Sequence, residues 1–398
     1  MHTLRSVIAV ALVILLPAAA SAQDDFRTWL AGLRAEARDQ GISDRTLDAA
    51  LADITPIARV IELDRDQPEF TETFWTYLGK RVSTRRIERG RALLKSHAGL
   101  LQRIQAQYGV QARFLVAFWG LETNFGEYMG SFPVIGSLAT LAHDPRRSDF
   151  FRAELLDALR IVDAGHITPV AMKGSWAGAM GQPQFMPSTF VRHAVDDDGD
   201  GRRDIWNSLP DVFASAANFL QRSGWQRGET WGREVTLPSG FDVELNGLKR
   251  RRSLADWQRL GVRRADGSDL PQVAGMQASL ILPGGHRGPA FLVYQNFRTI
   301  LVWNRSILYA IAVGHLADRL VGLGPLAAKA PADDRPLSRT QVIEIQTTLA
   351  ALGFQPGEPD GVVGPMTREA IKDYQRQTAL PADGYADHRL WQRLQTNR

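Results

Sequence analysis

The chain after residue 23 carries the hydrophobic pattern of helices. Ser43 stands directly before an apolar period that runs to Leu51, as expected for a residue that caps the start of a helix. Within Gly90–Tyr108, apolar side chains recur at helical spacing, which predicts a helix with one buried face. Residues 131–225 alternate short apolar runs with Gly-rich turns, so short helices are expected there as well.

The pattern changes between residues 228 and 300. Patches such as Arg233–Leu237 and Ala278–Leu282 are typical of strands, and Gly and Pro residues separate them. A helical pattern returns over Trp303–Leu320. The sequence therefore predicts a mainly α protein of the α+β class, in which a small β-containing insertion interrupts a helical domain.

A break in composition divides the chain near its C-terminal end. Residues 326–336 are rich in Ala, Pro and Asp and contain no large apolar residue after Leu326, which indicates a linker. Residues 337–398 then show the apolar pattern of three short helices. We expect a small separate domain there, near the lower size limit for an independent core, and a larger domain over residues 23–325.

The N-terminal segment has the features of a signal peptide. Met1–Arg5 carries a positive charge, Val7–Leu16 is an unbroken apolar run, and Ala20–Ala22 fits a signal-peptidase site. An N-terminal membrane anchor is the alternative, but the run is shorter than the roughly 20 residues that a spanning helix needs. We expect removal of residues 1–22, export of a protein without a membrane span, and a periplasmic location in a Gram-negative bacterium.

Composition excludes several kinds of chemistry. The 398 residues include no Cys, which removes disulfides, thiolate metal sites, a catalytic thiol and a lipid-modified N-terminal Cys. The net charge of +4 is too weak by itself to indicate nucleic acid, although it suits an anionic surface. We expect no nucleic-acid partner and no organic cofactor.

The segment Phe114–Gly126 places a carboxylate among aromatic residues. On a helix, the neighbours of Glu122 three and four positions away are Phe118, Trp119 and Phe125. Burial against such side chains disfavours the carboxylate and raises its pKa, as in a general acid that works near neutral pH. An ordinary ion pair between Glu122 and an Arg is the alternative from position alone.

A second segment, Lys173–Ser188, is rich in small residues. Its Gly and Ala residues allow a backbone to approach a ligand closely, and Ser175 and Gln184 supply polar groups. Tight internal packing explains such a run equally well.

Together, Trp119–Gly126 and Lys173–Ser188 resemble the signature blocks of the lytic murein transglycosylases of the membrane-bound B type. The resemblance covers about residues 24–322 and implies a lysozyme-like helical catalytic domain. Residues 337–396 resemble the small three-helix peptidoglycan-binding domain. Because lipoprotein members of the family carry a Cys, its absence indicates a soluble variant.

The resemblance implies roles for individual positions. Glu122 would be the single catalytic acid and base. The side chains expected to line the substrate cleft are Tyr77, Ser175, Gln184, Asn304 and Tyr309. Two positions depart from the family pattern, since Trp303 and Phe219 stand where relatives carry Tyr.

Asp144–Arg147 resembles a family stretch with paired arginines. Arg146 and Arg147 are therefore expected to hold carboxylates of the stem peptides of peptidoglycan, in bidentate fashion. A solvated basic turn is the alternative.

Residues 196–211 have the pattern of an EF-hand loop. Carboxylates stand at loop positions 1, 3, 5 and 9, which are Asp196, Asp198, Asp200 and Asp204. Gly201 occupies position 6, and Arg202 would offer its backbone carbonyl at position 7. Asn207 replaces the usual Glu at position 12, so Asp211 is expected to close the site, as in the slightly longer loop of the family.

Oxygen ligands favour Ca²⁺, with Na⁺ as the alternative, and the role would be structural. A solvated acidic turn without a metal is the competing interpretation of the loop, although clustered carboxylates repel each other unless a cation lies among them.

The lone acid favours a reaction that needs no second carboxylate. The resemblance implies that Glu122 protonates the glycosidic oxygen next to N-acetylmuramic acid and then removes the proton from the C6 hydroxyl of that sugar, which closes a 1,6-anhydro ring. A hydrolytic muramidase is one alternative and requires a second carboxylate about 5–9 Å away. A non-catalytic protein that binds peptidoglycan strands is the other.

Overall fold

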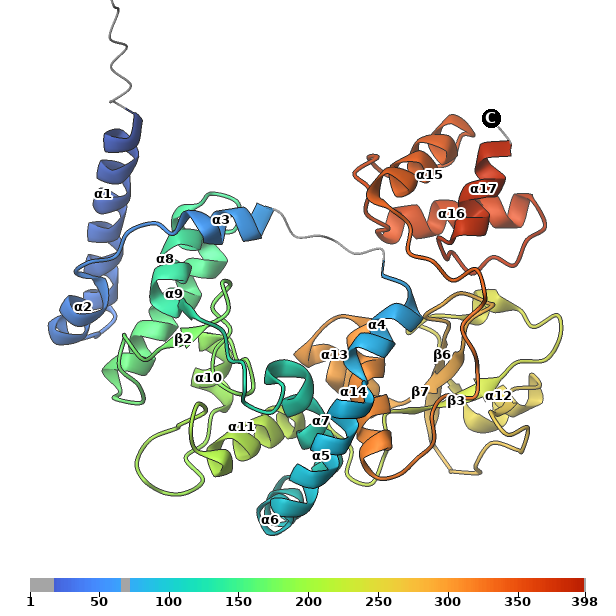
Figure 1. Cartoon of the computed structure of the whole chain (residues 1–398), viewed down its shortest axis with the longest axis horizontal. Coiled ribbons are helices and arrows are strands. Elements are labelled where there is room, and N and C mark those ends of the chain that lie inside the picture. The colour runs from blue at the N-terminus through green and yellow to red at the C-terminus, as the bar shows by residue number, and fades with distance from the viewer. Residues whose placement is uncertain (1–17, 66–71, 397–398) are drawn as a thin grey trace, which may run out of the picture. The chain divides into compact units, whose positions relative to one another are not determined.

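The computed structural model describes residues 18–65 and 72–396 (Figure 1). Most of the expected signal peptide, residues 1–22, therefore lies outside the described residues. The chain divides into two compact units. Among the described residues, the first comprises 18–65, Gly130–Gly181 and Phe185–Arg192, and the second comprises 72–129, Gln182–Gln184 and 193–396.

The first unit is mainly helical. Its elements are α1 (Ala18–Asp39), α2 (Asp44–Leu51), α3 (Ala58–Arg65), β1 (Phe132–Pro133), α8 (Val134–His143), α9 (Ser148–Asp163), β2 (Lys173–Gly174) and the start of α10 (Pro187–His193). As predicted, Ser43 caps α2, since its hydroxyl accepts a hydrogen bond from the N–H of Thr46. α8 is buried along Val134–Ala142 and packs against α9, and these two helices form the centre of the unit.

A helical bundle forms the main core of the second unit. Its helices are α4 (Phe74–Arg81), α5 (Thr84–Ser96), α6 (Ala98–Tyr108), α7 (Ala112–Thr123), α11 (Leu209–Arg222), α13 (Gln295–Trp303) and α14 (Ile307–Leu320). α7 and α14 pack against each other and are buried along most of their lengths. A helix that is apolar on every side is stable only inside a core, so these two helices occupy the centre.

One predicted helix is in fact two. The pattern of Gly90–Tyr108 is shared by α5 and α6, which meet at His97, where the backbone (φ −104°, ψ 19°) leaves helical geometry. Both helices present apolar side chains to the same core. The hydrophobic period therefore continues across the break and does not reveal it.

The predicted β-containing insertion is an antiparallel sheet in the second unit. Its strands have the order β4-β6-β7-β3-β5. Their bounds are β3 (Gly232–Thr236), β4 (Arg252–Ser253), β5 (Arg263–Arg264), β6 (Gln277–Ile281) and β7 (Ala290–Val293). The short helix α12 (Leu254–Arg259) places Trp257 in a second hydrophobic core with Leu280 and Leu292 of the sheet. A 3₁₀ turn, η1 (Val243–Leu245), lies in the same insertion.

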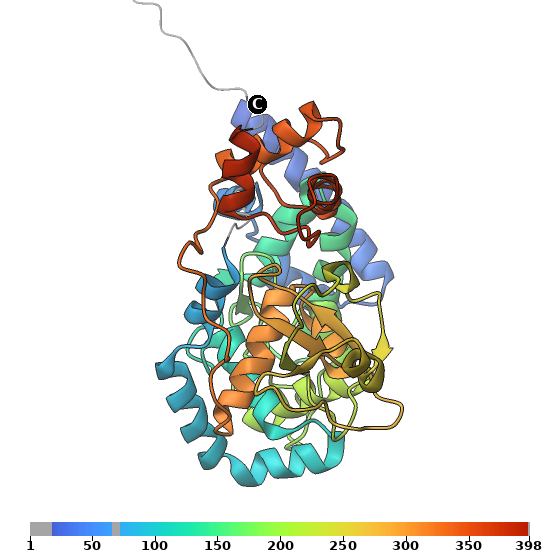
Figure 2. The same cartoon turned by 90° about the vertical axis from the view of Figure 1, so that its right-hand side faces the viewer.

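Three helices close the chain and form a compact group (Figures 1 and 2). They are α15 (Arg339–Ala351), α16 (Pro365–Gln377) and α17 (His388–Thr396). The apolar residues Val342, Ile345 and Leu349 are fully buried in a core of this group. Leu352, which shares their spacing, is 42% exposed because the helix ends one residue before it.

The linker and the last three helices also contact the rest of the second unit. Asp383 is buried and accepts a hydrogen bond from the backbone N–H of His286 (2.7 Å), whose Nδ1 lies 2.6 Å from the same carboxylate oxygen. Arg376 donates two hydrogen bonds to Glu244 (2.9 and 3.0 Å). Polar contacts therefore add to the covalent connection.

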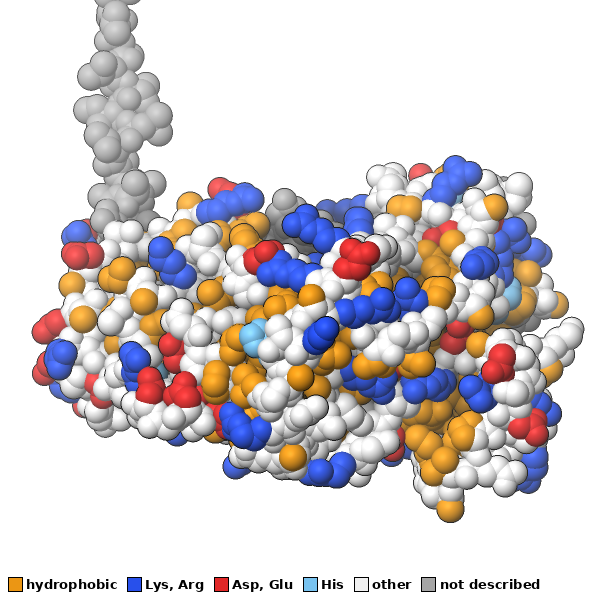
Figure 3. Space-filling view, turned by 60° about the horizontal axis from the view of Figure 1, so that its bottom comes forward, with side chains coloured by type: hydrophobic (Ala, Val, Ile, Leu, Met, Phe, Trp, Pro, Cys, Tyr) orange, Lys and Arg blue, Asp and Glu red, His pale blue; other side chains and the backbone are white. Residues whose placement is uncertain are grey.

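The surface is of mixed charge. Basic side chains are widespread on the face drawn in Figure 3, with acidic side chains between them. Among the described residues, no single helix is long and apolar enough to cross a membrane; α13 and α14 meet that test only as a pair, bent by 117°.

Candidate active site

The site is built around the end of α7. This helix ends at Thr123 because Asn124 (φ 51°) and Phe125 (φ 64°) adopt left-handed backbone conformations. The turn directs the Phe125 ring back over Gly120, where an added Cβ would lie 2.7 Å from the ring. Because Gly has no Cβ, only Gly at position 120 leaves room for this ring. The close contact holds the backbone beside Glu122 in one conformation.

Glu122 is partly buried and accepts two hydrogen bonds from side chains. Nε1 of Trp303, the last residue of α13, donates to Oε1 at 2.8 Å, and the hydroxyl of Tyr309 on α14 donates to the same oxygen. The ring of Phe118, one turn earlier on α7, stacks at a tilt on Trp303 with 4.5 Å between centroids. The interpretation of Glu122 as one half of an ordinary ion pair is therefore not supported.

The pKa of Glu122 is raised from about 4.5 to about 7 because its carboxyl group is buried. The hydrogen bonds from Tyr309 and Trp303 and the charge of Arg81 act in the opposite direction and lower this pKa. A carboxyl group with these properties is about half protonated at neutral pH, so it can donate a proton and later accept one.

Tyr77 and Arg81 of α4 complete this cluster. The guanidinium of Arg81 lies over the Tyr77 ring, 5.3 Å from its centroid. Burial raises the pKa of the Tyr77 phenol, the charge of Arg81 lowers it, and the charge of Glu122 raises it. The pKa of Tyr309 is raised well above its usual value, mainly by burial and in addition by the negative charge of Glu122. Both phenols therefore stay neutral hydrogen-bonding groups.

In the described part of the chain, no second carboxylate is among the groups that set the pKa of Glu122. Glu127, the nearest acid in sequence, forms an ion pair with Arg89, and its pKa is lowered by that hydrogen bond. It is exposed, and Asn124 also donates to it. Glu127 therefore has neither the burial nor the neighbours of a second catalytic acid.

Ser175 lies in a tight turn of the first unit. Its N–H donates to the carbonyl of Ala179 (2.7 Å), and its hydroxyl accepts from the N–H of Ala179 (3.0 Å). An added Cβ on Gly174 would lie 2.2 Å from the Ala179 carbonyl oxygen. Close internal packing therefore accounts for at least this part of the small-residue run.

Gln184 belongs to the second unit, at a left-handed backbone position (φ 50°). Its Nε2 donates to the carbonyl of Met129 at 3.0 Å. Nearby, Gln182 is buried, accepts a hydrogen bond from Nε1 of Trp119 (2.6 Å) and donates to the carbonyl of Trp206 (2.8 Å). The sequence does not indicate a role for Gln182, because its partners lie in other segments and leave no local signal.

Arg146 and Arg147 already have an acidic partner in the first unit. Arg146 donates to the backbone carbonyl (2.7 Å) and to the carboxylate (3.1 Å) of Asp64, and Arg147 donates to the other carboxylate oxygen of Asp64. Asp64 is buried at the end of α3. Because both guanidiniums remain partly exposed, each retains N–H groups that face solvent.

Asn304 has a different environment from Tyr309. It is exposed, and its side-chain oxygen accepts from the N–H of Ser306 (3.0 Å) in the turn between α13 and α14. That turn gives the two helices the directions that bring Trp303 and Tyr309 to one carboxylate.

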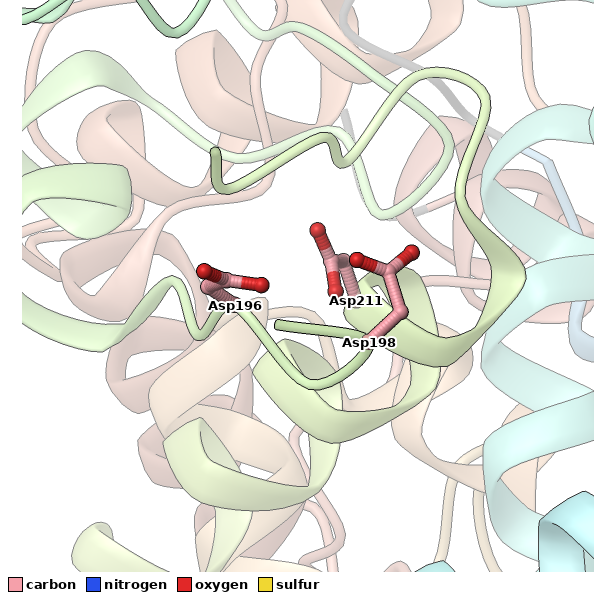
Figure 4. A group of neighbouring side chains, drawn as sticks. All are labelled: Asp196, Asp198 and Asp211. Atoms are coloured by element: carbon pink, nitrogen blue, oxygen red, sulfur yellow. The ribbon is translucent and has the colours of Figure 1, made fainter. Parts of the chain in front are cut away.

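The acidic loop brings three of its predicted ligands together. Carboxylate oxygens of Asp196, Asp198 and Asp211 lie within 4.8 Å of one another, and Figure 4 shows these side chains converging. Asp211 is fully buried in the first turn of α11 and accepts from the N–H groups of Asp197 and Asp204, both at 2.7 Å. Burial raises the pKa of Asp211.

The other predicted ligands of the loop have partners of their own. The carboxylate of Asp200 accepts from the backbone N–H (2.8 Å) and guanidinium (3.1 Å) of Arg202, and it is not one of the three that converge. Gly201 adopts φ 87°, a conformation that favours Gly. Three convergent carboxylates, one of them buried, are the donor set of a hard cation such as Ca²⁺.

Comparison with known proteins supports both domains. Residues 25–318 match the family model described as "Transglycosylase SLT domain", and residues 338–394 match "Putative peptidoglycan binding domain". The chain is 32% identical over 253 residues to membrane-bound lytic murein transglycosylase B of Escherichia coli K12, a match that spans 60% of this chain and 65% of that protein.

Solved structures of lytic transglycosylases are similar to this chain. The chain is 49% identical to SltB3 of Pseudomonas aeruginosa, crystallised in complex with NAG-anhNAM-pentapeptide, with a TM-score of 0.89 over 93% of this chain and 99% of that one. Slt35 of Escherichia coli, in complex with calcium, is 28% identical with a TM-score of 0.64 over 75% of this chain and 93% of that one. The predicted mainly α, lysozyme-like fold and the family resemblance are thus confirmed, and the chain belongs to the SLT family of lytic transglycosylases.

Proposed function

We propose that this protein is a peptidoglycan lytic transglycosylase that cleaves the β-1,4 bond between N-acetylmuramic acid and N-acetylglucosamine and leaves 1,6-anhydro ends. The observation that carries the proposal is the single buried carboxyl group of Glu122, with a pKa of about 7 and two side-chain donors. The activity of the relatives in the same family supports it.

The reaction uses one carboxyl group twice. Neutral Glu122 donates its proton to the glycosidic oxygen as the bond from that oxygen to C1 of N-acetylmuramic acid breaks, and the 2-acetamido carbonyl stabilises the developing cation at C1. The carboxylate then takes the proton of the C6 hydroxyl while that oxygen bonds to C1. Glu122 returns to its neutral form, and no water is consumed.

The other predicted site residues are proposed to bind substrate. Tyr77 and Tyr309, both neutral, offer hydroxyl groups beside Glu122. The remaining contacts to sugar and N-acetyl groups are assigned to Ser175, Gln184 and Asn304. Arg146 and Arg147 would bind stem-peptide carboxylates through the N–H groups that Asp64 leaves free.

We propose that the loop of residues 196–211 binds Ca²⁺ in a structural role. Asp196, Asp198 and Asp211 would be the central ligands. Asp200 and the carbonyl of Arg202 would join them after the Asp200–Arg202 contact rearranges. The calcium complex of the relative Slt35 supports this ion, and Na⁺ is the alternative.

The proposed organisation follows the sequence prediction. A signal peptide occupies residues 1–22, the catalytic domain residues 23–325, the linker 326–336 and the peptidoglycan-binding domain 337–398. Removal of the signal peptide would release the protein into the periplasm, where peptidoglycan is accessible.

Exhaustive digestion of purified peptidoglycan sacculi, followed by mass spectrometry of the fragments, tests the proposal. A lytic transglycosylase produces 1,6-anhydro-muramic ends. Reducing ends would instead identify a hydrolytic muramidase, and intact glycan strands would identify a binding protein.

A further inference from the structure

Both hydrogen bonds to Glu122 end on the same oxygen atom. Nε1 of Trp303 and the hydroxyl of Tyr309 donate to Oε1, and no donor within the described residues reaches Oε2. The two donors come from different helices, α13 and α14, so their convergence is a property of the packed structure.

A carboxyl oxygen has two lone-pair sites. On Oε1 of Glu122 both sites are occupied by donors, so the proton of the neutral carboxyl group belongs on Oε2. We propose that Trp303 is a positioning residue that makes Oε1 a permanent acceptor and thereby reserves Oε2 of Glu122 as the oxygen that donates and recovers the catalytic proton. This inference rests on the proposed function of Glu122.

Trp303 differs from Tyr309 in one decisive respect. A phenol can rotate and either donate or accept, whereas an indole N–H can only donate. The indole is also held in place, because the Phe118 ring lies 4.5 Å from it and the Phe219 ring meets it edge-on at 5.0 Å.

Few other charged or titratable groups influence the pKa of Glu122. α4 contributes Tyr77 and Arg81, α14 contributes Tyr309, and the group from α13 is the uncharged Trp303. The hydrogen bond from Trp303 stabilises the carboxylate and lowers the pKa of Glu122 against the effect of burial. Loss of the indole N–H therefore raises this pKa further, while the charge of Arg81 remains.

The test is the pH dependence of kcat/KM on soluble glycan chains for Trp303→Phe. Because the reaction starts from neutral Glu122, activity falls as pH rises through its pKa, and a higher pKa moves this alkaline limb to higher pH. We expect a displacement of about one pH unit, the size expected for one hydrogen bond to a charged group.

The matched control is Trp225→Phe. Trp225 is buried against Phe114, and its Nε1 donates to Gln111 (3.2 Å), so the control loses an indole hydrogen bond without touching Glu122. Its alkaline limb should coincide with that of the unmodified protein. A limb that is unchanged in Trp303→Phe, or displaced equally in both variants, overturns the role of Trp303.

A measurement on the unmodified protein covers the case in which Trp303→Phe does not fold. Among the indole N–H signals of the 10 Trp residues in ¹⁵N-labelled protein, one should shift with a midpoint near pH 7, and this shift should vanish in Glu122→Gln. Absence of such a signal contradicts the inference. Failure of the proposed function looks different, because Glu122→Gln would then remain active.

Discussion

At the scale of single residues, Glu122 is controlled by two opposing effects on its pKa. Burial raises the pKa, while the hydrogen bonds from Tyr309 and Trp303 and the charge of Arg81 lower it, and the balance lies at about 7. Burial alone would hold the proton too tightly to release it, and an exposed carboxylate would not hold it at neutral pH. Neutral donors near a buried acid therefore keep both protonation states accessible.

The first prediction concerns activity. Glu122→Gln keeps the size of the side chain and can still accept the hydrogen bonds of Trp303 and Tyr309, but it cannot transfer a proton. Positioned acid–base catalysis contributes about 10²–10⁴-fold, and here one group serves both steps, so we expect a loss at or above the upper end. Release of anhydro-muropeptides from sacculi measures it. Glu127→Gln is the control and should retain activity; a variant Glu122→Gln with more than about a tenth of the activity would show that another group is the acid.

The second prediction concerns stability. Since the pKa of Glu122 is about 7 in the folded protein and near 4.5 when unfolded, the folded state binds more protons between these values, and the free energy of unfolding falls as pH rises through this window. The resulting decrease in the free energy of unfolding amounts to at most about 3.4 kcal/mol at high pH. Glu122→Gln removes this loss of stability. The melting temperature of the variant minus that of the unmodified protein should therefore increase as pH rises from 4.5 to 8.

For Glu127→Gln, we expect the opposite dependence of stability on pH. The pKa of Glu127 is lowered by its hydrogen bond with Arg89, so its contribution to stability is present above the unfolded pKa and is lost as pH falls. Its replacement should lower the melting temperature slightly at pH 8 and not at low pH. Identical pH profiles for both variants would mean that the pKa of Glu122 is not raised.

At the scale of elements, the acidic loop depends on the helix that follows it. Asp211 occupies the first turn of α11, where a negative charge is favourable, and accepts backbone N–H groups from Asp197 and Asp204. These hydrogen bonds tie two points of the loop to one buried carboxylate. Asp196 and Asp198 are then brought close to Asp211, and their mutual repulsion favours a bound cation.

The third prediction is that Ca²⁺ raises the melting temperature of protein from which metals have been removed by a chelator. Binding only to the folded state contributes about 2.7 kcal/mol at a concentration 100 times the Kd. Asp196→Asn with Asp198→Asn should abolish the increase. The matched control is Asp204→Asn, whose carboxylate accepts from the N–H groups of Trp206 and Asn207 and is not one of the converging three; it should retain the increase. An unchanged melting temperature up to millimolar Ca²⁺ would speak against the site.

At the scale of the whole molecule, the C-terminal helices have a core of their own and also polar contacts with the rest of the second unit. Val342, Ile345 and Leu349 belong to that core, whereas Asp383 and Arg376 reach His286 and Glu244. The Arg376–Glu244 pair is partly exposed, and an ion pair of this kind contributes little by itself. The group is therefore expected to add binding to an insoluble polymer without building the catalytic site.

The fourth prediction follows from this arrangement. A chain that ends at residue 336 should bind sacculi more weakly, because a second binding module raises the effective concentration of the first on a polymer. Turnover of soluble glycan fragments should be largely retained, since the cluster at Glu122 comes from α4, α7, α13 and α14. Arg376→Gln, which removes the contact with Glu244 and the local pair with Asp373, should keep full sacculus binding. Loss of both binding and turnover in the shortened chain would contradict a modular organisation.

Local features were predictable because their causes are local. The cap at Ser43, the strands near Arg233–Leu237 and the apolar face of α15 each depend on residues a few positions apart. The identification of Glu122 as a candidate acid also rested on its neighbours along one helix. The break at His97 was not predictable, since both helices face one core and keep the hydrophobic period.

By itself, the sequence determined the helical class, the small β insertion, the family and the candidate acid, all of which depend on residue type and spacing. Only the tertiary structure decided which groups act on that acid. Trp303 and Tyr309 stand 181 and 187 positions from Glu122 and meet it on one oxygen, and Asp64 pairs with Arg146 and Arg147 across 82 and 83 positions. Hydrogen bonds and burial act between groups that packing brings together, and the spacing of residues along one segment carries no record of such partners.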